Sequence, residues 1–255
     1  MEFARKVIRQ LDRLVSLILI VLLLLAGLYA VYALWDNSQV YRNAEDAQEG
    51  LLRYKPTADT EEGSEGDGFP ELMAINPDVC AWITMDNTGI DYPVVQGSTN
   101  LSYISTDVYG DYSLSGSIFL DSRNRRDGSD AFNLLYGHYM EKGRMFGDLD
   151  RYREKSYFRE NRTGRYTLPD RSFELRVIAC FQAPASEDFI FNPAYASAHI
   201  PEMLEYAEKH AEQIDTEIFE QVKAMEKRRI LALTTCSEDY TDSRTVLITL
   251  MSEGG

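Results

Sequence analysis

The sequence predicts a mostly β domain with added helices, preceded by a membrane-spanning helix near the N-terminus. Three observations lead to this prediction: an uncharged apolar run over residues 14–34, a series of short apolar runs after Phe69, and a segment rich in helix-forming residues over 201–225. Short strands with added helices are typical of a β-barrel or a β-sandwich. The 255 residues leave enough chain outside the apolar run for one domain with a full core.

The apolar run from Leu14 to Leu34 has the properties of a transmembrane helix. It holds 21 residues without a charge. At a rise of about 1.5 Å per residue it would extend roughly 30 Å, which is the thickness of a bilayer's hydrocarbon layer. Tyr29, Tyr32 and Trp35 cluster at its far end, as aromatic residues do at a membrane interface.

The charges around this run predict its orientation and the division of the chain. Basic residues precede it and acidic residues follow it, which places the N-terminus in the cytoplasm and the rest outside. A cleaved signal peptide is the alternative, but its apolar region usually has roughly 7–15 residues and ends in small ones. We therefore expect a cytoplasmic tail (1–13), a transmembrane anchor (14–35), an extracellular helix and acidic linker (36–68), and a folded domain (69–255).

The net charge of −15 argues against a nucleic-acid partner. Phosphate binding requires clustered positive charge, and the domain is acidic. The one basic run, over residues 227–229, is interpreted as a solvated lead-in to a strand. Residues 57–68 are rich in Gly, Glu, Asp and Ser, a composition that predicts a flexible linker.

Eight runs after Phe69 have the length and composition of β-strands. They cover residues 79–84, 90–96, 117–121, 132–136, 164–168, 173–181, 229–235 and 244–251. Residues 201–225 differ, because Glu, Ala, Lys and Leu dominate there, and this composition predicts one or two helices. The helical segment thus precedes the strand that leads to Cys236.

Cys236 is the leading candidate for a nucleophile. It ends the apolar run 230–236, and the residues that follow are polar. Arg244 opens the next apolar run eight residues later, so a tight connection would place the two residues side by side on adjacent strands. The alternative is a buried thiol with no chemical role.

His138 is the candidate partner of Cys236, because it follows an apolar strand and Gly137. A cysteine–histidine pair has to be close in space, not in sequence. The thiolate is the reactive form, and a nearby cation lowers the cysteine pKa from about 8.5. An arginine such as Arg244 has the donors to stabilise an oxyanion. The three residues together predict cysteine-based acyl transfer.

The remaining cysteines and motifs give no sign of a second reactive thiol or of a metal or cofactor site. Cys80 and Cys180 lie within apolar runs and are interpreted as core residues, although a bridge between them is possible. No pair of His or Cys has the spacing of CxxC or HExxH, and there is no phosphate-binding loop or GxSxG motif. We therefore expect neither a metal nor a cofactor.

Several segments resemble the class B sortases. Residues 231–236 are similar to the sortase signature, commonly Thr-Leu-x-Thr-Cys, with Ala232 in place of the first Thr. Residues 136–138 resemble the segment that carries the sortase histidine. Further matches cover 76–78, 82–83, 92–96, 116–121, 123–124 and 145–149. Arg244 matches the sortase arginine, and the helical insertion is also a class B feature. The resemblance extends over roughly residues 70–251.

The resemblance implies a closed eight-stranded sortase β-barrel and a catalytic domain over residues 69–255. It implies that Cys236 cleaves a sorting signal of surface proteins through a thioacyl-enzyme, with His138 and Arg244 as the other catalytic residues. An amine of a peptidoglycan precursor or of a pilin would resolve the intermediate. Thr234 and Thr235 would line the substrate groove. The expected enzyme is anchored in the cell membrane of a Gram-positive bacterium, with its catalytic domain outside.

Two alternatives make different predictions. A cysteine protease would let water resolve the acyl-enzyme, so that added amine would not change the product. A non-catalytic surface binding domain would keep Cys236 buried and unreactive toward thiol reagents.

Overall fold

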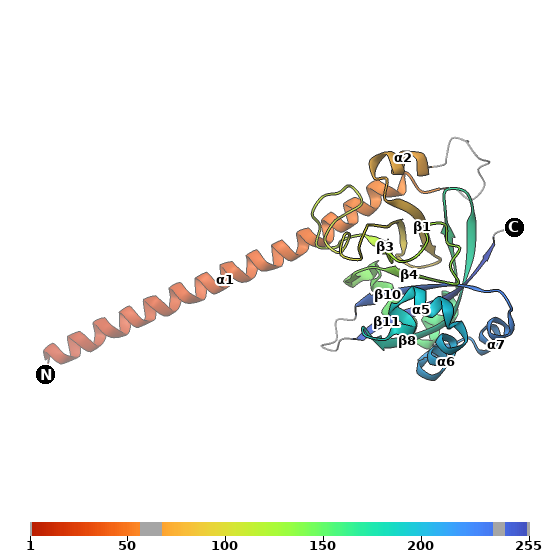
Figure 1. Cartoon of the computed structure of the whole chain (residues 1–255). Coiled ribbons are helices and arrows are strands. Elements are labelled where there is room, and N and C mark those ends of the chain that lie inside the picture. Colours follow the sequence, from red (N-terminus) through yellow and green to blue (C-terminus); the bar gives the residue numbers. More distant parts are fainter. Residues whose placement is uncertain (1, 57–67, 237–242, 254–255) are drawn as a thin grey trace. The chain divides into compact units, whose positions relative to one another are not determined.

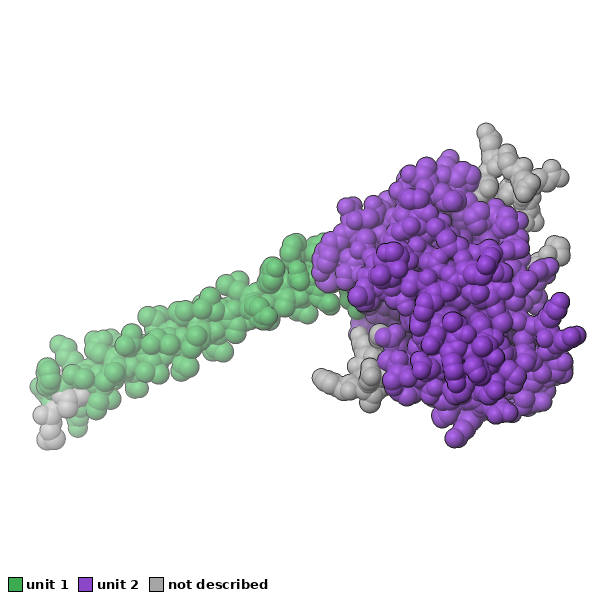
Figure 2. All heavy atoms as spheres, in the orientation of Figure 1, with its two compact units in different colours: residues 1–43 green, residues 44–255 purple. Residues whose placement is uncertain are grey.

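The computed structural model describes residues 2–56, 68–236 and 243–253 of the chain. The chain divides into two compact units, Met1–Asn43 and Ala44–Gly255, which Figure 2 shows in green and purple. The first unit is a single helical segment, and the second contains the strands and the shorter helices (Figure 1). The predicted linker falls largely on residues 57–67, which lie outside the described residues.

The helix α1 runs from Glu2 to Leu52, and its part up to Asn43 forms the first unit. The apolar side chains of this part are exposed; Leu23 and Leu34, for example, are each 73% exposed. Exposed apolar side chains on all sides of a helix are costly in water and favourable in lipid. By length and composition, α1 is able to cross a membrane, as the sequence predicts.

Eight strands of the second unit close into a mixed β-barrel. They follow the order β11-β10-β4-β3-β2-β1-β7-β8, and the pairing of β8 with β11 closes the ring. The strands are β1 (Val79–Met85), β2 (Asp91–Val95), β3 (Ile118–Leu120), β4 (Phe132–Tyr136), β7 (Thr163–Thr167), β8 (Ser172–Pro184), β10 (Arg229–Cys236) and β11 (Ser243–Glu253). The prediction of a closed eight-stranded barrel is confirmed, and the sandwich alternative is excluded.

Each predicted strand run contains one strand of the barrel, and most bounds agree within one or two residues. The largest difference is β8, which extends to Pro184 because it pairs with β11 from Phe173 to Pro184. The short strands β5 (Tyr139–Met140), β6 (Arg144–Met145) and β9 (Gln213–Ile214) are additional. Each of these strands has only two residues, which is too short for an alternating pattern in the sequence to predict it.

The predicted helical segment contains α6 (Ile200–His210) and α7 (Thr216–Ala224). Two shorter helices, α4 (Asp188–Phe191) and α5 (Pro193–Ala198), come before them and were not predicted. The remaining helical elements are α2 (Phe69–Ile75), η1 (Glu141–Gly143), η2 (Gly147–Arg153) and α3 (Lys155–Glu160). Helices this short are stabilised by packing rather than by their own sequence, so composition does not predict them.

Strand β10 is buried on both faces. Ile230 and Ala232 belong to a cluster with side chains of α5, α6 and α7, which cover this side of the barrel (Figure 1). The alternate residues Leu231 and Leu233 are also fully buried. Burial on both faces explains why the sequence shows an uninterrupted apolar run here rather than an alternating one.

The last turns of α1 belong to the second unit, whose contacts begin at Ala44. Leu51 packs in a buried cluster with Phe69 and Leu72 of α2 and with Trp82 of β1. Gln48 is also buried and accepts a hydrogen bond of 2.9 Å from the hydroxyl of Tyr92. Residues 44–52 therefore contribute to the core of the second unit, although they precede Phe69.

Candidate active site

Three strands bring the predicted residues to one end of the barrel. Strands β4 and β10 are parallel, with Tyr136 opposite Thr234, and β11 is antiparallel to β10, with Arg244 opposite Cys236. β4 ends at Tyr136, and His138 follows two residues later, where it lines one pocket with Thr235 and Arg244. The backbone therefore gathers His138, Cys236 and Arg244, which lie far apart in sequence. The side chain of Cys236 and residues 237–242 lie outside the described part.

Gly137 fixes the path of the chain immediately before His138. A Cβ atom at this position would lie 2.4 Å from Cδ1 of Ile118 and 2.7 Å from the ring of Phe146. The amide of Gly137 donates a hydrogen bond of 3.1 Å to the carbonyl of Thr234 on β10. Glycine is therefore required for the close approach that holds His138 beside the end of β10.

One ring nitrogen of His138 is held by the loop between β2 and β3. Its Nε2 lies 2.7 Å from the carbonyl oxygen of Ile104. Because a carbonyl oxygen only accepts hydrogen bonds, Nε2 carries a hydrogen in this arrangement. The bond orients the imidazole and leaves Nδ1 for other partners.

A pocket of about 140 Å³ lies at this end of the barrel. It is lined by Ile104, Phe119, Tyr136, Gly137, His138, Thr234, Thr235 and Arg244. Thr234 and Thr235, the predicted substrate-binding residues, are nearly fully buried but contribute to this lining. The hydroxyl of Thr234 donates to the carbonyl of Thr245, at 3.0 Å. This bond fixes the Thr234 side chain against β11.

Arg244 lies against two aromatic rings. Its guanidinium carbon is 5.8 Å from the ring centre of Tyr136 and 5.3 Å from that of Phe191. Both distances fall within the range of cation–π interactions. The ring of Tyr136 in turn stacks on Phe119, with 5.2 Å between the ring centres. The aromatic contacts restrict a side chain that has several rotatable bonds.

Tyr136, Phe191 and Ile104 were not predicted as site residues. Tyr136 lies directly before Gly137 and His138, so its position in that segment could have indicated a role. Phe191 belongs to the unpredicted helix α4, and Ile104 contributes only its backbone carbonyl to His138. The sequence carries no signal for these two contacts.

Cys80 and Cys180 are free and buried, so the structure contains no bridge between them. Burial raises the pKa of the Cys80 thiol to about 12, and the charge of Arg126 opposes the shift only in part. Burial likewise raises the pKa of Cys180 far above the usual range. Both thiols therefore stay protonated at neutral pH and are poor nucleophiles.

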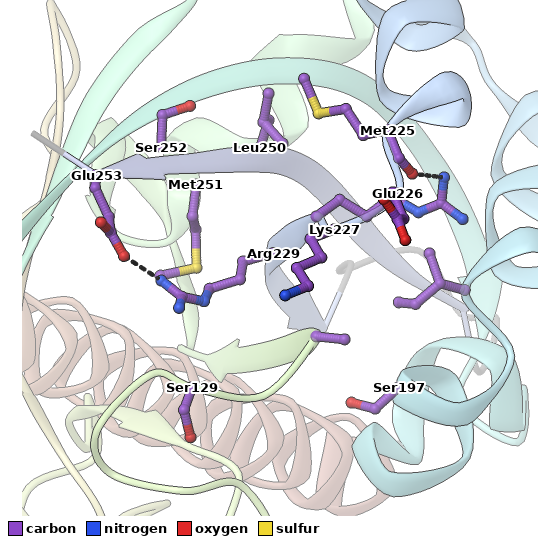
Figure 3. Close-up of a pocket in the computed structure, with 13 residues that line it drawn as sticks. Ser129, Ser197, Met225, Glu226, Lys227, Arg229, Leu250, Met251, Ser252 and Glu253 are labelled. Carbon is purple, nitrogen blue, oxygen red and sulfur yellow. Dashed lines mark hydrogen bonds and ion pairs between the residues drawn. The ribbon is translucent and has the colours of Figure 1, made fainter.

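A larger cavity, of about 610 Å³, lies at the opposite end of β10, where the strand begins with Arg229 (Figure 3). Its lining mixes charged, serine and apolar side chains, and Arg229 donates a hydrogen bond of 3.0 Å to Glu253 there. No group of three or more His, Cys, Asp or Glu among the described residues could hold a metal ion. Size alone thus does not identify the active site, because the candidate residues line the smaller pocket.

Comparisons with known proteins identify relatives of this chain. No family model matches the chain. The sortase B of Listeria monocytogenes is 26% identical over 240 residues, which cover 93% of this chain and 95% of that protein. The sortase B of Staphylococcus aureus is 26% identical over 175 residues, or 69% of this chain and 70% of that protein.

Solved structures extend the similarity to the fold. A class B sortase of Streptococcus pyogenes involved in pilus biogenesis has a TM-score of 0.66 and 36% identity, and the match covers 74% of this chain and all of that one. A Staphylococcus aureus sortase B–substrate complex has a TM-score of 0.66 at 22% identity, covering 87% of this chain and 98% of that one. The barrel and its cysteine strand define an enzyme of the sortase type. The chain belongs to the class B sortases, which are cysteine transpeptidases, and the predicted family is confirmed.

Proposed function

We propose that this sortase cleaves a sorting signal in surface proteins and transfers them to an amine, with Cys236 as the nucleophile. The observation that supports the proposal is the pairing of Cys236 with Arg244 across β10 and β11, together with the pocket that His138 and Arg244 both line. The class B relatives support the same reaction type.

The proposed reaction proceeds through a thioacyl-enzyme. The thiolate of Cys236 attacks the scissile carbonyl, a sulfur–carbon bond forms, and the peptide C–N bond breaks. His138, in its protonated form, gives a proton to the leaving amine. In the second half, an incoming amine attacks the thioester, its proton passes to His138, and Cys236 leaves as the thiolate.

Arg244 is proposed to bind the negative charge that develops on the carbonyl oxygen. A guanidinium held against aromatic faces can still donate hydrogen bonds in its own plane. Donors fixed in advance stabilise an oxyanion more strongly than mobile ones. Thr234 and Thr235, which line the same pocket, are proposed to contact the substrate.

The acceptor is proposed to be an amine of a peptidoglycan precursor or of a pilin. The 36% identity to a class B sortase involved in pilus biogenesis favours the pilin, because the identity to the Staphylococcus aureus sortase B–substrate complex is only 22%. A lysine side chain would then supply the attacking nitrogen.

The test uses the full chain in detergent, with peptides that carry the C-terminal sorting motifs of surface proteins encoded in the same genome. Each peptide is incubated with a pilin lysine peptide, with a cross-bridge amine, or with water alone, and the products are identified by mass spectrometry. The proposal predicts an amide product that depends on added amine. Hydrolysis unaffected by either amine would show a cysteine protease instead.

We also propose a single-pass type II topology with the catalytic domain, residues 69–255, outside the cell. The exposed apolar part of α1 and the charges that flank it support this orientation. N-terminal sequencing of the cell-associated protein should recover the cytoplasmic end. A mature start near Asn37 would show a cleaved signal peptide.

A further inference from the structure

A buried carboxylate lies next to the pocket of the candidate active site. Asp121 follows β3 and has no solvent exposure. A buried charge is costly unless hydrogen bonds and an opposite charge compensate it. Arg123 supplies much of the compensation, with its Nε at 2.9 Å and its Nη2 at 2.7 Å from the two carboxylate oxygens.

The hydrogen bonds keep Asp121 ionised despite its burial. Burial by itself would raise the pKa of this carboxyl, but the bonds from Arg123 and Asn100 outweigh it, and the pKa is lowered. The Asn100 amide donates at 2.8 Å, and the hydroxyl of Tyr136 donates at 3.1 Å. Asp121 therefore connects the loops after β2 and β3 with the end of β4.

The same ion pair connects two elements that flank Arg244. Asp121 accepts from Tyr136 on β4, and Arg123 donates through Nη2 to the carbonyl of Phe191 on α4, at 2.6 Å. Tyr136 and Phe191 are the residues whose rings contact the Arg244 guanidinium. One ion pair, formed by a buried carboxylate and an arginine whose side chain is 44% exposed, thus bonds to both residues that flank Arg244.

We propose that Asp121, paired with Arg123, is a positioning residue that orients Arg244 through Tyr136 and Phe191. The inference rests on the proposed role of Arg244 in catalysis. Loss of the Asp121 charge releases the Tyr136 hydroxyl and the Arg123 side chain, so both rings can shift. A displacement of about 1 Å at a catalytic group can cost on the order of a hundredfold in rate.

The chain offers a matched control, because Asp127 forms the same kind of pair with Arg125. The two residues are again two positions apart, with Nη2 of Arg125 2.9 Å from Asp127. This pair is exposed, and its side-chain contacts lie within its own loop and not at the rings around Arg244. The backbone carbonyl of Asp127, which a substitution to Asn keeps, accepts a hydrogen bond from Arg171. Asp127→Asn therefore removes an equivalent charge without affecting Arg244.

The experiment measures kcat and KM of Asp121→Asn and Asp127→Asn in the full chain, with the peptide and amine that the wild type uses. We expect Asp121→Asn to lower kcat roughly ten- to hundredfold with KM changed less than about threefold. The alkylation rate of Cys236 should stay near wild type, because the nucleophile is not altered. Asp127→Asn should leave both kinetic constants unchanged.

A double-mutant cycle separates positioning from a general structural role. If Asp121 acts through Arg244, then Asp121→Asn causes little further loss in the Arg244→Lys background. Equal, additive losses in both backgrounds would overturn the proposal. Tyr136→Phe keeps the ring over Arg244 but removes the hydroxyl bonded to Asp121, so it provides the same test if Asp121→Asn does not fold. A Tyr136→Phe variant with wild-type kcat would also contradict the proposal.

The outcomes distinguish this inference from the proposed function. Absence of an amine-dependent product in the wild type, or turnover by Cys236→Ala, would overturn the proposed function and this inference with it. If the wild type is active but the rate losses of Asp121→Asn and Arg244→Lys are additive, the positioning role of Asp121 is overturned and the proposed function stands.

Discussion

An arginine lies at each end of strand β10, Arg229 on β10 itself and Arg244 on the neighbouring strand β11, and the two arginines have different surroundings. Arg229, at the start of β10, forms an ion pair with Glu253 beside the larger cavity. Arg244, opposite the last residue of β10, lies against the rings of Tyr136 and Phe191. A carboxylate neutralises a guanidinium and occupies its donors, whereas aromatic faces orient it and leave in-plane donors available. The comparison shows why the smaller pocket is the better candidate for oxyanion chemistry.

The largest expected effect concerns the end that carries Cys236. Cys236→Ala should abolish both the thioacyl intermediate and the product, because the buried thiols of Cys80 and Cys180 cannot replace it. His138→Ala should be nearly inactive for a different reason, since the leaving amine would lack its proton donor. Mass spectrometry of the enzyme with substrate detects the intermediate. Wild-type activity in Cys236→Ala would contradict the proposed mechanism.

A matched pair of substitutions tests the difference between the two arginines. Arg244→Lys keeps the charge but loses the rigid fork of donors, and should cost about 3–4 kcal/mol of transition-state stabilisation, a rate loss on the order of a hundred- to a thousandfold. Arg229→Lys, at the other end of β10, should leave turnover unchanged. Steady-state kinetics and a titration of the Cys236 thiol should be measured for each variant. A large rate loss with an unshifted thiol titration supports the oxyanion role. Near-normal turnover of Arg244→Lys would show that Arg244 acts only through its positive charge on the Cys236 thiol and does not bind the oxyanion.

The thiols in the barrel interior should affect stability and not activity. Replacing both Cys80 and Cys180 with Ala should lower the free energy of unfolding by at most about 3 kcal/mol, and kcat should stay near wild type. Abolished turnover in a folded double variant would assign these residues a chemical role.

The same thiols predict a pH dependence of stability. In the unfolded chain a cysteine ionises near pH 8.5, whereas the folded pKa of Cys80 is about 12. The unfolded state therefore loses its proton first, and stability falls as pH rises above about 8.5, by up to about 1.4 kcal/mol per pH unit for each thiol. Urea titrations at pH 7 and pH 10 should show this loss in the wild type and a smaller loss in the double alanine variant.

The smallest effect is expected at the far end of β10. Glu253→Gln breaks the ion pair with Arg229, whose partners are 35% and 72% exposed at the side chain. Exposed pairs contribute roughly 0–1 kcal/mol, so the free energy of unfolding should change by less than about 1 kcal/mol, with no change in kcat. A large loss of activity would mean that the larger cavity takes part in the reaction.

The strand pattern shows which parts of the fold were predictable. Each of the eight strand runs contains a barrel strand, because apolar runs bounded by turn residues are a strong local signal. Helices α4 and α5 were missed, since four to six residues are stabilised by contacts with the barrel and not by composition. The contribution of Leu51 and Gln48 to the core of the second unit was also missed. A helical segment with few apolar residues gives no pattern that predicts which element it packs against.

The sequence by itself determined the apolar N-terminal helix, the strands, the sortase family and the three residues proposed for catalysis. These features follow from hydropathy, local periodicity and short motifs, all of which are properties of neighbouring residues. Only the tertiary structure decided that Tyr136 and Phe191 flank Arg244 and that Ile104 holds His138. It also decided that Asp121 and Arg123 connect these elements. Such contacts join residues from different strands, helices and loops, so they arise only when the barrel closes.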